Sequence, residues 1–198
     1  YPALDINKLS MKRDYPQSNH FVWAGRLTEG KAPDLAVEAI GLLKERGVDV
    51  KLDLFGVGHP SERKAMRERI ESAGLNDQIT MRGIRPGEMA KHYANYDALL
   101  FTSRSAEPFA MTVLEAMLSR LPCIVSKFGG NQEILEDGVN ALLYESNNVE
   151  ALVEAIKRFM DLSDHGRALA THNIEELQER HSLDKFYENI ESHLSPAI

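Results

Sequence analysis

Two glutamates that lie eight residues apart are the side chains of this sequence best suited to chemistry. They belong to residues 103–117, which read SRSAEPFAMTVLEAM. Glu107 precedes a proline that suits the first turn of a helix, so we expect it in a loop and Glu115 about two turns into that helix. Because a carboxylate accepts two neighbouring hydroxyl hydrogens, each glutamate could hold a vicinal diol. By spacing alone, a helix-starting glutamate and an exposed helical glutamate without a ligand stay an open alternative.

The helix expected after Glu107 also predicts a site for an anion. The backbone N–H groups of Ala110, Met111 and Thr112 would have no partner inside the helix. The N-terminus of a helix attracts phosphate through such N–H groups and through the helix dipole. One glutamate would then hold a sugar diol and the other a ribose diol, with phosphates between them.

Two cations follow the apolar run at residues 21–25, in the segment GRLTEGK. Arg26 presents a planar fork and Lys31 a point charge, a pair that suits a diphosphate. The glycines of this segment let the backbone approach a ligand closely. Two solvated surface cations are the alternative for this segment taken alone.

The elements that must position these residues alternate between short apolar runs and helical patterns. We expect six strands, at residues 21–25, 50–56, 79–82, 98–101, 123–126 and 141–144. We expect helices at residues 33–46, 61–73, 87–94, 110–119, 131–135, 149–160, 163–178 and 183–193. Consecutive parallel strands need long crossovers, so the pattern predicts an α/β fold: a Rossmann-like, doubly wound parallel sheet with extra C-terminal helices. Ligands of such sheets bind beyond the carboxyl ends of the strands, where the candidate residues lie.

Three more strand ends carry glycine. Gly56 and Gly58 lack the third glycine of a dinucleotide fingerprint, so we interpret them as a simple strand-to-helix turn. After the third strand, Arg82 and a glycine precede Ile84, whose backbone could meet a flat base. The glycine pair at 129–130 allows a close approach to phosphate.

Composition narrows the class of function. Hydrophobic residues make up 43% of the chain and charged residues 27%, as in ordinary globular domains. The formal net charge of −7 makes a nucleic-acid partner unexpected, so local cations must meet any phosphate. The single cysteine, Cys123, excludes an internal disulfide and favours a cytoplasmic location. No apolar stretch approaches the ~18 residues of a membrane span, and no His, Cys or Asp cluster has metal-ligand spacing.

Taken in order, these motifs resemble the C-terminal, donor-binding domain of family 4 retaining glycosyltransferases, the glycosyl transferases group 1. The matches are Gly25-Arg26-Leu27 with Lys31, Gly56-Val57-Gly58, Arg82-Gly83, Glu107-Pro108-Phe109, Glu115-Ala116-Met117, Pro122, Gly129-Gly130 with Glu133, and Asp137-Gly138. They cover about residues 20–145, and the ordered set is far more specific than any one match. The resemblance implies one half of the two-domain GT-B fold.

The resemblance also implies roles for residues. The substrate would be a nucleotide-diphosphate sugar, and the enzyme a glycosyltransferase of the hexosyltransferase type that retains the anomeric configuration. Glu107, Arg26 and Lys31 would be catalytic. The donor-binding set would be Gly25, Arg26, Lys31, Gly56, Arg82, Ile84, Glu107, Phe109, Ala110, Met111, Thr112 and Glu115. Cations and a helix dipole, rather than a metal or a cofactor, would stabilise the leaving phosphate.

Two positions depart from the family pattern, which usually has glycine where this chain has Ala110 and Arg120. The methyl group of Ala110 would hold a phosphate slightly further away. If Arg120 needs left-handed backbone geometry, the substitution costs about 1–2 kcal/mol.

The resemblance divides the chain into three parts. Residues 1–18 would link two domains, residues 19–180 would form the donor-binding domain, and residues 181–198 would form a helix that crosses back to an N-terminal domain. That other domain would bind the acceptor (a glycan, a lipid or a small molecule) and make any peripheral membrane contact. We expect this chain alone to be inactive.

Two other classes stay open. One is another enzyme on the same architecture, either a nucleotide-sugar epimerase or a pyridoxal-dependent sugar phosphorylase, for which Lys127 is the loosely placed candidate lysine. The other is a non-catalytic α/β binding module. Pyridoxal absorbance, product analysis without an acceptor, and saturable nucleotide binding would separate these classes.

Overall fold

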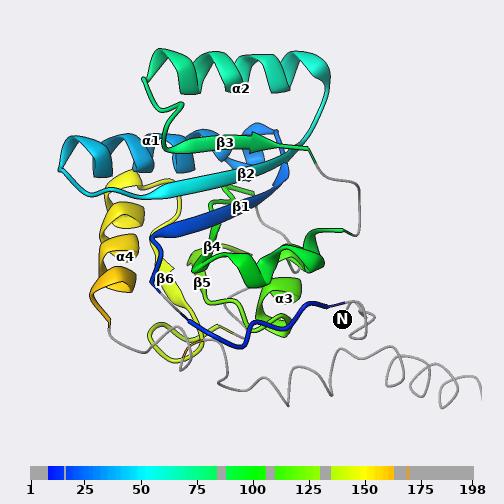
Figure 1. The fold of residues 1–198 in the computed structure, drawn as a ribbon, viewed down its shortest axis with the longest axis vertical. Helices are drawn as coiled ribbons and strands as arrows, with labels where there is room; N and C mark the ends of the chain where they lie inside the picture. Colours follow the sequence, from blue (N-terminus) through cyan, green and yellow to red (C-terminus); the bar gives the residue numbers. More distant parts are fainter. Residues whose placement is uncertain are drawn as a thin grey trace, which may run out of the picture.

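Six parallel strands form one sheet in the computed structural model of this chain, which describes residues 9–15, 17–83, 88–105, 110–129, 135–162 and 169. The strands are β1 (His20–Arg26), β2 (Lys51–Val57), β3 (Ile79–Arg82), β4 (Ala98–Phe101), β5 (Cys123–Ser126) and β6 (Leu142–Tyr144). Their order across the sheet is β3-β2-β1-β4-β5-β6 (Figure 1). The predicted α/β class and the six strands are confirmed.

The helices are α1 (Pro33–Glu45), α2 (Pro60–Ser72), α3 (Met111–Leu118) and α4 (Val149–Asp161), with 3-10 turns η2 (Glu29–Lys31), η3 (Met89–Lys91) and η4 (Tyr93–Asn95). Proline occupies the first turn of both α1 and α2. An N–H group at this position has no partner within the helix, so the missing N–H of proline costs no hydrogen bond. The helix expected at 87–94 is wrong in its described part. No side chain caps η3 or η4, and the segment forms two short turns that bury Met89, Ala90 and Tyr93. The helices expected at 131–135, 163–178 and 183–193 fall largely or wholly outside the described residues.

The sheet separates two hydrophobic cores. Side chains of α1, α2 and α4 pack on one face, and side chains of α3, η3 and η4 pack on the other. In Figure 1 the sheet accordingly passes between α4 and α3. Strand residues alternate between the two cores: within β4, Leu100 faces the first and Leu99 the second. The strands are therefore covered on both faces, which explains their continuous apolar runs.

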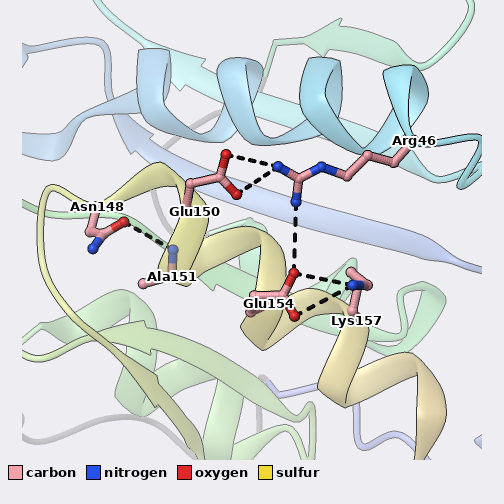
Figure 2. Close-up of polar contacts among 6 residues, drawn as sticks. All are labelled: Arg46, Asn148, Glu150, Ala151, Glu154 and Lys157. Atoms are coloured by element: carbon pink, nitrogen blue, oxygen red, sulfur yellow. Dashed lines mark hydrogen bonds and ion pairs between the residues drawn. The ribbon is translucent and has the colours of Figure 1, made fainter.

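Polar contacts join α1 to α4 at the rim of the first core. Figure 2 shows Arg46, which follows α1, reaching across to two glutamates of α4. It donates to both carboxylate oxygens of Glu150 at 2.7 Å and lies 3.7 Å from Glu154. Lys157 also donates to Glu154, and the side chain of Asn148 caps the first turn of α4. These ions are exposed, so the apolar contact between the helices contributes more to stability than the ion pairs do.

Residues 9–15 lie on the second core, against the end of α3. The ammonium of Lys12 is buried and donates to the carbonyl of Tyr96 at 2.7 Å, and burial lowers the pKa of this group. The backbone of Lys12 donates to the carbonyl of Ser119 at 2.9 Å, and the hydroxyl of Tyr15 to that of Arg120 at 2.9 Å. This part of the predicted linker, residues 1–18, is therefore packed on the domain.

Within the described ranges, no helix has the length and apolar character needed to cross a membrane.

Candidate active site

The strand order places the topological switch point of the sheet between β1 and β4. From β1 the chain proceeds to β2 on one side, and from β4 it proceeds to β5 on the other. Open α/β sheets bind ligands in the crevice at the carboxyl ends of the two strands where the order reverses. The loop that carries Lys31 follows β1, and the loop that leads to Glu107 follows β4. Both candidate loops therefore lie at the position where this rule places a ligand, which is called the crevice below.

The two loops are joined through the carbonyl group of Gly30. It accepts hydrogen bonds from the backbone N–H of Arg104 at 2.7 Å and of Ser105 at 3.2 Å, and from the hydroxyl of Ser103 at 3.1 Å. A Cβ at this position would lie 2.1 Å from Oγ of Ser105, so a larger residue would require that side chain to move. The glycine that the sequence suggested for close approach to a ligand thus allows close approach between two loops.

Lys31 extends over the end of β4. Its ammonium lies 5.8 Å from the ring centroid of Phe101, the last residue of β4. Its backbone carbonyl accepts a hydrogen bond from the hydroxyl of Thr102 at 2.9 Å. Arg26 is the exposed last residue of β1 and pairs in register with Val57 of β2. The two predicted cations therefore belong to the same edge of the sheet, Lys31 toward β4 and Arg26 toward β2.

A third cation beside the crevice, Arg104, was not predicted. It holds the carboxylate of Asp34 with two bonds of 3.1 and 2.9 Å and also donates to Asn147 at 2.5 Å. These contacts anchor the loop after β4 to α1 and to the loop after β6. Seventy residues separate Arg104 from Asp34, so no local pattern signals the pair.

The helix α3 begins at Met111, within one residue of the predicted start. Ala110 precedes it in an extended conformation, with φ −88° and ψ 103°, and no side chain caps the first turn. Glu115 lies four residues after Met111, so it is about one turn into the helix. The predicted depth of two turns was wrong, because it counted from Pro108, whereas the described helix begins at Met111.

Glu115 is half-buried on the face of α3 beside η4, rather than an exposed helical residue. Burial raises the pKa of its carboxyl group, and a hydrogen bond from the hydroxyl of Tyr93, 3.5 Å from Oε2, acts in the opposite direction. The same hydroxyl lies 3.4 Å from the carbonyl of Thr112. A carboxylate held in this way can accept further neutral hydroxyl donors, as the diol hypothesis requires.

Packing inside the fold accounts for the small size of three predicted donor-binding residues, Gly25, Gly56 and Ala110. A Cβ at Gly56 would lie 2.5 Å from a methyl carbon of Leu27, and a Cβ at Gly25 would lie 3.1 Å from the ring of Trp23. Both glycines therefore have a packing reason besides any ligand. Ala110 is buried in the second core and has a negative φ, so its methyl group adds no backbone strain.

Arg82 has a partner within the fold. Its Nε donates to the buried carboxylate of Asp53, which also accepts from the hydroxyl of Tyr96 at 2.7 Å and lies 3.4 Å from His20. Burial alone would raise the pKa of Asp53, but the hydrogen bonds from Tyr96 and Arg82 outweigh burial and lower it. Arg82 pairs in register with Phe55, two residues beyond Asp53, so its side chain runs back along the sheet from the carboxyl edge. A donor contact of Arg82 stays a prediction.

Glu107, Phe109 and Ile84 lie outside the described residues, and so does Glu133. Their predicted contacts stay predictions. In the part of the chain that is described, no three His, Cys, Asp or Glu side chains gather as metal ligands, which leaves the metal-free expectation as it stands.

Curated proteins are similar in sequence to this chain over most of its length. The family described as Glycosyl transferases group 1 matches residues 9–176. The chain is 29% identical over 178 residues to a D-inositol 3-phosphate glycosyltransferase of Paenarthrobacter aurescens, covering 86% of this chain and 43% of that protein. It is 31% identical over 171 residues to the GtfA subunit of a UDP-N-acetylglucosamine--peptide N-acetylglucosaminyltransferase of Streptococcus gordonii, covering 84% of this chain and 33% of that protein. The chain thus spans less than half the length of both relatives.

Solved structures share the fold. Anabaena HepE, in complex with UDP and glucose, has a TM-score of 0.84 at 22% identity, covering 100% of this chain and 56% of that one. The C-terminal domain of LpcC, a glycosyl transferase group 1 family protein from Francisella tularensis, has a TM-score of 0.77 at 21% identity, covering 91% of this chain and 100% of that one. The family match extends over most of the sequence and the sheet has the expected architecture. The chain belongs to the glycosyl transferases group 1 family.

Proposed function

We propose that this chain is the donor-binding half of a retaining glycosyltransferase, which moves a sugar from a nucleotide-diphosphate sugar to an acceptor. The observation that carries the proposal is the joined pair of loops at the switch point. Through the carbonyl of Gly30, these loops bring Lys31 and the segment leading to Glu107 to one crevice. Solved structures of similar fold include HepE with UDP-glucose, which supports a nucleotide sugar as the ligand.

Each candidate residue has a role in this proposal. Arg26 and Lys31 hold the diphosphate, and the N-terminus of α3 adds its N–H groups to the same charge. When the bond between the anomeric carbon and the phosphate oxygen breaks, negative charge grows on the departing phosphate. Preorganised cations and dipoles stabilise that charge more strongly than they stabilise the bound substrate, and this difference lowers the barrier. Neither a metal nor a cofactor takes part in the proposed reaction.

The other donor contacts follow the same arrangement. Glu115 binds the ribose hydroxyls, Glu107 binds the transferred sugar, and the backbone of Ile84 meets the base. Because the chain spans less than half of its curated relatives, we assign acceptor binding to an N-terminal domain. The cytoplasmic location remains part of the proposal and rests on the single cysteine, which is buried.

The position of Lys127 argues against the alternative of a pyridoxal-dependent sugar phosphorylase. A cofactor lysine of that kind needs an apolar pocket that lowers the pKa of its amine. Lys127 is exposed to solvent after β5.

Calorimetry with UDP, GDP and ADP tests the proposal. We expect saturable binding of one of the three, and a loss of affinity of about tenfold or more for Lys31→Ala, as expected for a lost charge-assisted hydrogen bond. The matched control is Lys64→Ala, which removes an exposed lysine of α2 whose contact is the glutamate four residues later. Equal affinity of both variants for the nucleotide, or no saturable binding by the unsubstituted protein, would contradict the proposal.

A further inference from the structure

The hydroxyl group of Thr102 lies at the centre of a buried hydrogen-bond network beside the crevice. Thr102 directly follows β4 and is fully buried. Its Oγ1 accepts a hydrogen bond from the indole Nε1 of Trp23 at 2.9 Å. Its single proton is shared between two carbonyl oxygens, that of Lys31 at 2.9 Å and that of Ala32 at 2.8 Å. The proton of this hydroxyl and one of its two acceptor lone pairs are thus used within the fold.

The backbone that this hydroxyl holds is strained. Ala32 has φ 49° and ψ 52°, in the left-handed region that disfavours residues with a Cβ. It also precedes Pro33, whose ring further restricts the preceding residue. Such strain persists where the surroundings determine the conformation, and it gathers at functional sites. Hydrogen bonds hold the backbone of Ala32 in this conformation. Its carbonyl accepts from the hydroxyl of Thr102, and its N–H donates to the carbonyls of Thr28 and Glu29.

The strained turn fixes Lys31, the residue before it. The carbonyl of Lys31 bonds to Thr102, and its ammonium lies over the ring of Phe101, the residue before Thr102. Two consecutive residues at the end of β4 therefore hold both the backbone and the charged group of Lys31. Trp23, on the adjacent strand β1, holds Thr102 in turn.

We propose that Thr102 is a positioning residue for diphosphate recognition. Its hydroxyl, oriented by Trp23, fixes the turn at Ala32 and so holds the ammonium of Lys31 over the crevice before a ligand binds. A charge that is already placed loses less conformational freedom when it binds phosphate, which increases affinity. The inference rests on the proposed function, in which Lys31 contacts the diphosphate.

Two substitutions separate the hydroxyl from the shape of the side chain. Thr102→Val keeps the shape and removes the hydrogen bonds, whereas Thr102→Ser keeps the hydroxyl and removes a methyl group. Ile156→Val, in the buried part of α4 on the first core, is a control for general loss of stability. Trp23 is the one tryptophan of the chain, so its fluorescence reports the network directly and shows whether each variant folds.

The measurement is the affinity for the nucleoside diphosphate that the unsubstituted protein binds, in a double-mutant cycle with Lys31→Ala. We expect Thr102→Val to weaken binding by about three- to tenfold, the cost of ordering one long side chain on binding, with Thr102→Ser and Ile156→Val within about twofold of the unsubstituted protein. In the Lys31→Ala background, Thr102→Val should have no further effect. We also expect Thr102→Val to shift the emission of Trp23, because the indole N–H loses its acceptor.

Four results would overturn the inference. The first is that Thr102→Val binds the nucleoside diphosphate as tightly as Ile156→Val does. The second is that the double variant with Lys31→Ala loses affinity by the product of the two single losses, which would mean that the two residues act independently. If Thr102→Val does not fold, the Ser variant decides: weakening like that of Lys31→Ala despite the retained hydroxyl would refute a role of the hydrogen bonds. Absence of saturable binding by the unsubstituted protein would overturn the proposed function and this inference together. The other results leave nucleotide binding intact, so they would overturn this inference alone.

Discussion

Glycine at position 120 should make the protein more stable than alanine at the same position. Arg120 follows the end of α3 with φ 59°, the left-handed geometry for which the family pattern uses glycine. A residue with a Cβ costs about 1–2 kcal/mol in this conformation. Glycine also gives the unfolded chain more freedom, which offsets about 0.4–1 kcal/mol of that gain. The net difference between glycine and alanine at this position is therefore about 1 kcal/mol in favour of glycine.

The matched variant is Arg120→Ala, because alanine removes the same side chain and keeps the backbone strain. Nε of Arg120 is buried without a hydrogen-bond partner among the described residues, so neither variant breaks a bond of this atom. The bond from the hydroxyl of Tyr15 goes to the backbone carbonyl and survives in both. The alanine-to-glycine comparison therefore isolates the strain from the loss of the side chain.

Urea denaturation and thermal melting measure the difference. We expect Arg120→Gly to unfold at a higher urea concentration than Arg120→Ala and to melt about 2–4 °C higher, since a chain of this size shifts by that amount per kcal/mol. If the glycine variant is no more stable than the alanine variant, the left-handed backbone at this position carries no strain and the reasoning fails.

Two further predictions concern carboxyl groups whose pKa values are shifted, those of Glu115 and Asp53. Burial raises the pKa of Glu115, so the folded protein loses stability as the pH rises from the unfolded value, near 4.3, through the folded one. Glu115→Gln should therefore raise the free energy of unfolding at pH 7 and lose this advantage near pH 4; a gain that is independent of pH would contradict it. Asp53 has a lowered pKa, so it stabilises the fold above about pH 3.9 and loses that effect as the pH falls through its folded value. Asp53→Asn should cost about 2 kcal/mol at pH 7 in urea denaturation, for the charge-assisted bond from Arg82, with the difference disappearing in acid; an equal loss at low pH would contradict the role of the charge.

The positions of the strands follow from the sequence because their signal is local. A strand covered on both faces needs an unbroken apolar run, and each such run can be read without knowing its neighbours. All six expected strands lie within one residue of their observed bounds, and α3 starts within one residue of its expected start. Where several weak local preferences compete, as in η3 and η4, packing decided the outcome instead, and the expected helix was wrong.

Strand order is a different kind of information. Parallel connections place all carboxyl ends on one edge of the sheet, but they do not say which strands are neighbours. That β1 lies beside β4, and hence where the switch point falls, depends on packing between segments far apart in the sequence. The bonds from Ser103 and its neighbours to Gly30 have the same origin, since they join residues 73 or more positions apart.

The same division holds for the charged residues of the candidate site. Residue type and spacing identified Arg26, Lys31 and Arg82 as cations at strand ends, because a side chain's charge is a property of the residue itself. Only the tertiary structure paired Arg82 with Asp53, and Arg104 with a carboxylate of α1, while it held Lys31 over the end of β4. Whether a cation meets a ligand or a neighbouring side chain depends on distances of a few ångströms, because charge pairing weakens as separation and solvent exposure increase. The sequence therefore determined which groups lie near the site, and the fold decided which of them it holds with partners of its own.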